Sequence, residues 1–153
     1  MATEWANPNV PNLPDFLLFV QFGMAIDPLY LPTDSPVYQW SLTRALALVI
    51  NLPACAGPDY TLAVYNCAGH VLITIAPDQE GRDYFECLRE KLGLLKFAAG
   101  VVAATADQAT STTLAVPDSL AQLTIGDLDF IRSPWGRVAL AYNQDYGGIW
   151  GLS

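Results

Sequence analysis

The chain is poor in charged residues, and poorest in cations. Only 14% of its residues are Asp, Glu, Lys or Arg, whereas ordinary soluble domains have about 25%. Seven Lys and Arg stand against fifteen acidic residues, which gives a net charge of −8 at pH 7. Proteins that hold nucleic acid by its phosphates need clustered Lys and Arg. No window of this chain is basic, so the composition argues against nucleic-acid binding, sequence-specific or otherwise.

Two further features are missing, a membrane-length apolar run and a disulfide framework. The longest apolar stretch, residues 16–31, is interrupted by Gln21, Asp27 and Pro28 and is too short to span a bilayer. Three cysteines, an odd number without a C-x-x-C pair, argue against structural disulfides. The N-terminal residues show no basic flank followed by an apolar run, as a signal peptide would. We therefore expect a protein that is made and folded in a reducing cytosol and does not enter a membrane.

What the chain does have is apolar residues, at 52% of the total. This content excludes a disordered chain, and a length of 153 residues suits one domain. A monomer of this length should expose roughly 7,600 Å² of surface to solvent. With so few charges, much of that area would be uncharged, and such patches usually mark protein contacts. The sequence thus predicts a surface that is covered by neighbouring proteins. A monomer with a surface rich in Ser, Thr and Asn is the alternative.

The spacing of apolar residues predicts a mainly α fold, a small helical bundle formed by residues 16–153. Helix starts follow Ser35-Pro36, Gly57-Pro58 and Ser133-Pro134, because a capping or turn residue followed by proline favours the first helical turn. A further helix is expected over 83–92, ending at Gly93, and short helices are expected at 117–123 and after Thr124. We expect a short helix ending near Gly23, whereas 71–75 fits either helix or strand. Trp135, Val138, Ala141 and Tyr142 are the predicted buried face of the last helix.

Three segments stand outside this helical pattern. Residues 1–15 carry Pro8, Pro11 and Pro14, which favour an extended arm, with a frayed terminus as the alternative. Residues 98–116 are expected to form a long loop or hairpin excursion. Residues 147–153 are expected to form a docking tail. We expect all three to make protein contacts; for the tail, the alternative is that Trp150 folds back onto Trp135 and Tyr142 of its own chain. The predicted interface residues are Trp5, Val10, Val101, Val102, Leu114, Val116, Ile149, Trp150 and Leu152.

The residues that could carry chemistry are few. His70 follows Cys67 at C-x-x-H spacing, and Cys55 and Cys87 would complete a set of four zinc ligands. The neighbours of this pair are apolar, which disfavours a reactive thiolate, so buried, inert cysteines are predicted. Acidic residues between 78 and 90 fit a solvated helix face better than a pair of catalytic carboxylates. No phosphate loop, hydrolase or dinucleotide motif is present. The sequence predicts no enzyme activity, no catalytic residue, no metal and no cofactor.

Four stretches carry a resemblance to a known class of proteins. They are Ser133-Pro134-Trp135-Gly136-Arg137, the segment 146–152 (YGGIWGL), the segment 60–66 (YTLAVYN) and Thr110-Ser111-Thr112-Thr113. Together, over roughly residues 35–153, the chain resembles small structural proteins of tailed bacteriophages, in particular head–tail adaptors. The resemblance implies a virion protein that forms a homo-oligomeric ring between the portal protein and the tail or nozzle proteins. Two alternatives stay open, another structural protein of the phage tail, and a small helical binding protein or enzyme for a hydrophobic ligand.

Overall fold

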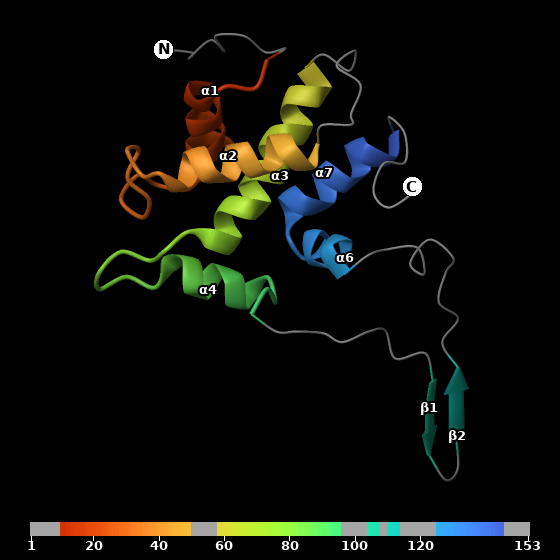
Figure 1. The fold of residues 1–153 in the computed structure, drawn as a ribbon. Helices are drawn as coiled ribbons and strands as arrows, with labels where there is room; N and C mark the ends of the chain where they lie inside the picture. The colour runs from red at the N-terminus through yellow and green to blue at the C-terminus, as the bar shows by residue number, and fades with distance from the viewer. Residues whose placement is uncertain (1–9, 50–57, 96–103, 108–109, 114–124, 146–153) are drawn as a thin grey trace.

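The computed structural model describes residues 10–49, 58–95, 104–107, 110–113 and 125–145. It is mainly helical, as the sequence predicts, and the helices pack around one central helix, α3 (Figure 1). The elements in chain order are α1 (Leu13–Leu18), the π-helix η1 (Phe19–Gly23), α2 (Val37–Leu48), α3 (Pro58–Ile75), α4 (Tyr84–Lys91), β1 (Ala104–Asp107), β2 (Thr110–Thr113), α6 (Ile125–Arg132) and α7 (Pro134–Asp145).

The central helix α3 forms the spine of the core. Eleven of its eighteen residues are buried, so it is apolar nearly all round, as a helix enclosed by neighbours must be. α2 packs against it along one side and α7 along another. Residues 71–75, which fit strand or helix from sequence alone, lie in the last turns of α3. Leu72 and Ile73 are buried there, whereas Thr74 and Ile75 are exposed. Adjacent buried residues followed by adjacent exposed ones fit a helical period and not the alternation of a half-buried strand.

The N-terminal boundary differs from the prediction in one respect. Residues 13–15 were expected in an extended arm, but they form the first turn of α1. The Asn12 side chain caps this helix by accepting a hydrogen bond from the Asp15 amide at 3.0 Å, and Pro14 lies in the first turn. Proline is favoured at that place, so Pro14 indicates a helix start here instead of an extended chain. Residues 1–9 of the expected arm lie outside the described residues.

The last helix is rotated relative to the prediction. Its start at Pro134 is confirmed, but its buried residues include Gly136, Ala139 and Leu140, while Val138 and Ala141 are exposed. The cause lies in the turn that joins α6 to α7. A Cβ atom at Gly136 would overlap the Phe130 carbonyl group, so the two helices approach each other closely at this glycine, and that contact sets the rotation of α7. Trp135 and Tyr142 are only partly buried.

A short antiparallel hairpin lies within the stretch expected to form a loop or hairpin. β1 pairs with β2 in the register Ala104 with Thr113 through Asp107 with Thr110. In Figure 1 the hairpin stands apart from the helices. The expected short helix at 117–123 lies outside the described ranges. Among the helices that are described, none has the length and apolar character needed to cross a membrane.

Candidate functional site

Of the nine predicted interface residues, only Val10 belongs to the described part of the chain. Its side chain is 53% exposed, just before the Asn12 cap of α1. Trp5, Val101, Val102, Leu114, Val116, Ile149, Trp150 and Leu152 lie outside the described residues. Their role in contacts stays a prediction.

The only histidine, His70, lies at a buried junction of α3 with the α6–α7 turn. Its Nδ1 atom lies 2.7 Å from the Ser133 hydroxyl, and that hydroxyl also accepts a hydrogen bond from the Gly136 amide at 2.9 Å. The Phe130 ring packs on the imidazole, with 4.3 Å between ring centroids. His70 is 4% exposed and Ser133 is fully buried. A serine and a histidine in hydrogen-bond contact resemble a catalytic dyad, but no substrate could reach this pair, and Ser133 serves as the N-terminal cap of α7.

Burial also determines the chemistry of His70 and Cys67. It lowers the pKa of His70 to about 4, against a smaller opposing effect of Asp129, so the imidazole is neutral at pH 7. It raises the pKa of the Cys67 thiol to about 12, which keeps the thiol protonated and a poor nucleophile. Cys67 is therefore buried and inert, as predicted. The same expectation is wrong for Cys87, which is exposed on α4, because α4 lies at the edge of the bundle and buries little besides Phe85. Within the described ranges no three His, Cys, Asp or Glu side chains could hold a metal ion.

Several large apolar side chains are exposed on the described surface. Phe22 on η1 is 74% exposed, Leu29 in the loop before α2 is 65% exposed and Trp40 on α2 is 60% exposed. Leu95 after α4 is also more than half exposed. Single exposed apolar residues are ordinary, but four large apolar side chains that are more than half exposed, on a chain with so few charged residues, leave surface that is suited to partner contacts.

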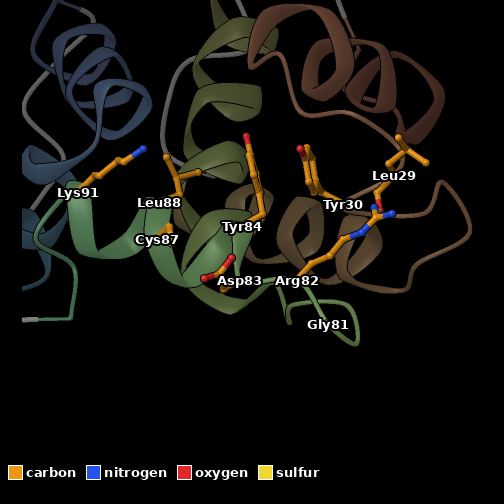
Figure 2. Close-up of a pocket in the computed structure, with 9 residues that line it drawn as sticks. All are labelled: Leu29, Tyr30, Gly81, Arg82, Asp83, Tyr84, Cys87, Leu88 and Lys91. Carbon is orange, nitrogen blue, oxygen red and sulfur yellow. The ribbon is translucent and has the colours of Figure 1, made fainter.

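The described residues form a surface pocket of about 590 Å³ beside α4 (Figure 2). Its wall combines two loops with one face of the helix. The lining residues are Leu29 and Tyr30 from the loop before α2, Gly81, Arg82 and Asp83 from the loop before α4, and Tyr84, Cys87, Leu88 and Lys91 from α4 itself. The volume is within the usual range for ligand sites, about 300–1,000 Å³.

Two tyrosines and one arginine fix the loop end of this pocket. The rings of Tyr30 and Tyr84 stack with 4.1 Å between centroids and 9° between planes, and Figure 2 shows them side by side. The Arg82 guanidinium lies 5.7 Å from the Tyr30 ring centre, in a cation–π contact, and donates a hydrogen bond to the Leu29 carbonyl group. Burial raises the pKa of Tyr84, with a smaller contribution from Tyr30, so its hydroxyl stays neutral. These contacts tie together two loops that lie about fifty residues apart in sequence.

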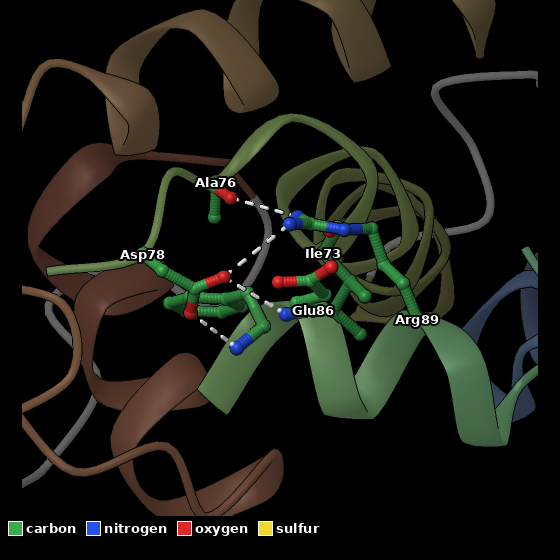
Figure 3. Close-up of polar contacts among 6 residues, drawn as sticks. Ile73, Ala76, Asp78, Glu86 and Arg89 are labelled. Atoms are coloured by element: carbon green, nitrogen blue, oxygen red, sulfur yellow. Dashed lines mark hydrogen bonds and ion pairs between the residues drawn. The ribbon is translucent and has the colours of Figure 1, made fainter. Parts of the chain in front are cut away.

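The helix side of the pocket is held by a second polar cluster, centred on Arg89 and Asp78 (Figure 3). Arg89 donates hydrogen bonds to the carbonyl groups of Ile73 and Ala76 at the end of α3, at 3.1 and 2.8 Å, and pairs with Asp78 at 3.5 Å. Asp78 in turn accepts hydrogen bonds from the amides of Phe85 and Glu86, at 2.6 and 2.9 Å. One ion pair thus satisfies the last carbonyl groups of α3 and the first amides of α4, and fixes the angle between the two helices.

The sequence did not reveal this pocket. Of the acidic residues between 78 and 90, Glu80, Asp83, Glu86 and Glu90 are exposed, as the predicted solvated face requires, but Asp78 caps α4 from outside the helix. The pairing of Tyr30 with Tyr84 joins residues 54 positions apart, which no local pattern signals. The one available signal was Asp78 itself, an acidic residue a few positions before a helix start.

Comparison with known proteins finds no matching family model, no matching curated protein and no matching solved structure. The function must therefore be argued from the residues themselves.

Proposed function

We propose that this protein is a structural subunit that works by assembly, forming a homo-oligomeric adaptor ring between the portal and the tail of a tailed bacteriophage. It has no catalytic role in this proposal, and its location is the virion, after synthesis in the host cytoplasm. The resemblance of segments 60–66, 110–113, 133–137 and 146–152 to head–tail adaptors supplies the identity of the assembly. The exposed apolar side chains of the described surface supply the physical support.

The single observation that carries the assembly proposal is the exposure of Phe22, Leu29 and Trp40. Each leaves most of a large apolar side chain in water, although a fully buried side chain of this kind contributes about 1.5–3 kcal/mol. The chain also has few charges to keep such a surface soluble. Contact with another protein would bury these side chains and gain that free energy. Exposed aromatic residues often dominate the energy of an interface.

The groups that could act in catalysis are buried, which also supports a role in assembly. The Ser133–His70 pair is sealed within the core, and the Cys67 thiol is protonated and buried. A hydrophobic-ligand binder, the alternative of a different class, would be favoured by an enclosed apolar cavity. The pocket beside α4 is instead a surface pocket whose lining includes three charged residues, Arg82, Asp83 and Lys91, so it does not favour that alternative.

The test is the mass and shape of the purified full-length chain. We expect a closed ring in electron micrographs and a single large species in sedimentation velocity. Trp40→Gln should shift that species toward monomer, whereas Gln39→Ala, an exposed neighbour on α2, should not. A chain that stays monomeric at every concentration, alone and with a phage portal ring, would contradict the proposal. A monomer that binds apolar small molecules in native mass spectrometry would support the binder instead.

A further inference from the structure

The pocket beside α4 is built before any partner arrives. Its loop end is fixed by the Tyr30–Tyr84 stack and by Arg82, and its helix end by the Arg89–Asp78 pair. A site whose walls are already ordered loses little conformational entropy on binding. The pocket therefore has the rigidity of a recognition site, although no element of the described chain fills it.

The lining specifies what would fit. Tyr84 and Leu88, four residues apart on α4, give an apolar floor, and Leu29 adds an exposed apolar edge. Lys91 lies one helical turn beyond Leu88, and Figure 2 shows its side chain on the same side of α4 as those of Tyr84 and Leu88. Within the described part of the chain, the Lys91 side chain makes no hydrogen bond or ion pair. A fitting segment would place an aromatic or large apolar side chain on the floor and a carboxylate beside Lys91.

The chain itself contains such a segment, in the predicted N-terminal arm. Glu4 is followed directly by Trp5, so one short stretch offers a carboxylate and the side chain with the largest apolar area. Pro8 lies between this pair and the α1 cap, and proline favours an extended chain that presents its side chains without internal hydrogen bonds. Tryptophan is also among the residues most enriched as interface anchors.

We propose that the pocket beside α4 binds the Glu4–Trp5 segment of a second copy of the chain. The inference rests on the proposed assembly. An arm of one copy seated in a pocket of the next is a head-to-tail contact, which closes into a ring when the rotation between copies permits it. Trp5 covers Tyr84 and Leu88, and the Glu4 carboxylate pairs with the Lys91 ammonium. In an acidic chain, where cations are scarce, this pairing gives the contact its orientation.

A cross-linking experiment tests the contact directly, because the Cys87 thiol lines the pocket and is exposed. The full-length chain carries Ala6→Cys beside an intact Glu4–Trp5 pair, with Cys55→Ser to remove a competing thiol, while Cys67 stays buried. Mild oxidation should give covalent dimers and higher multimers on a non-reducing gel. They should disappear when Cys87→Ser is added. Gln39→Cys in place of Ala6→Cys is the matched control for random collision and should cross-link at least fivefold less.

The outcomes separate the arm contact from its rivals. A cross-link that forms within one chain, seen as an oxidised species of monomer mass, would overturn the proposal in favour of an arm folded on its own pocket. Equal cross-linking from position 39 would also overturn it, since collision alone would then explain the product.

A charge exchange tests the orientation without cysteines. Glu4→Lys and Lys91→Glu should each weaken self-association about tenfold, because each places like charges together. The double variant should recover to within about threefold of the original Kd, since the pair is restored with reversed signs. Lys91 is exposed, and circular dichroism checks that helix content is unchanged in each variant. If copies assemble but neither variant nor cross-link has an effect, the arm contact is wrong and the assembly proposal stands. If the unmodified chain does not associate at all, both are wrong.

Discussion

Two polar clusters of this protein contrast in an instructive way. The first is the buried junction formed by His70, Ser133, Phe130 and Gly136, and the second is the open pocket of Tyr30, Arg82, Tyr84 and Lys91. The junction contains the residue types of a catalytic dyad, but it is closed to solvent and stabilises the packing of α3 on the α6–α7 turn. The pocket is instead open to solvent, and the Tyr30–Tyr84 stack already holds its wall in place. Accessibility, more than residue type, separates a structural cluster from a candidate site.

The largest expected effect concerns pH and the buried junction. The pKa of His70 is lowered to about 4 in the folded chain, from an ordinary value of 6.5. The unfolded chain therefore takes up a proton first as pH falls. The contribution of His70 to stability is full above pH 6.5, declines as pH falls, and is lost below about pH 4, by about 3 kcal/mol in total. Urea unfolding across this range should show the decline. A His70→Gln variant should lack that component while keeping the pH dependence due to carboxyl groups, and an unchanged profile in the variant would contradict the assignment.

The second effect breaks the same junction by crowding it. Gly136→Ala places a Cβ atom against the Phe130 carbonyl group, and backbone cannot move aside as a flexible side chain can. We expect a loss of about 2–3 kcal/mol in the free energy of unfolding, as in other overpacked sites. The matched control is Ala141→Gly, an exposed position on the same helix, which should cost at most about 1 kcal/mol through helix propensity. Equal losses in the two variants would mean that the close approach of α6 and α7 is absent.

The third effect loosens the wall of the pocket without touching its lining. Arg89→Ala removes the hydrogen bonds to Ile73 and Ala76 and the ion pair with Asp78. We expect a loss of about 2 kcal/mol, because hydrogen bonds from a charged group to partly buried carbonyl groups are among the stronger ones. Chemical denaturation measures it. Glu90→Gln, one residue along and exposed, should change stability by less than about 0.5 kcal/mol. A comparable loss in Glu90→Gln would show that α4 is sensitive to any substitution there, and that the Arg89 contacts are not the cause.

The smallest stability effect is expected at the pocket itself. Arg82→Ala removes a cation–π contact and one hydrogen bond at an exposed site, and should cost about 1 kcal/mol or less. If the pocket is a partner site, the same variant should weaken assembly beyond this small loss, whereas Arg137→Ala, exposed on α7, should leave assembly unchanged. Thermal melting of the chain and sedimentation of the assembly provide the two readouts. A change in melting temperature without a change in assembly would show that Arg82 stabilises the fold and does not contribute to a partner site.

Much of the fold could be predicted because its signals are local. Ser35-Pro36 and Pro134 mark the starts of α2 and α7, and a positive φ of 70° at Gly93 ends α4 where a C-terminal glycine was expected. The helical spacing of apolar residues in α2 predicts one buried face; Tyr38, Leu42, Ala45 and Val49 are buried, and Leu46 is partly buried. Such caps and stripes depend on neighbours within a few residues, so one sequence is enough to recognise them.

The predictions were wrong where the local sequence is compatible with two structures. Pro14 fits an extended arm as well as a first helical turn, and only the Asn12 cap decides for the helix. The buried face of α7 could not be chosen from the sequence, because residues 138–142 are all apolar, and the contact of Gly136 with Phe130 selects it. The exposure of Cys87 likewise follows from the edge position of α4, which the sequence does not encode locally.

The sequence by itself thus determined the fold class, most helix boundaries, the low content of charged residues and the absence of familiar catalytic motifs. Each of these depends on composition or on residues within one or two helical turns. Only the tertiary structure decided that His70 meets Ser133, that Tyr30 stacks on Tyr84 and that Asp78 joins Arg89. These contacts connect residues 11 to 63 positions apart. They form only when the close packing of whole helices brings their side chains together.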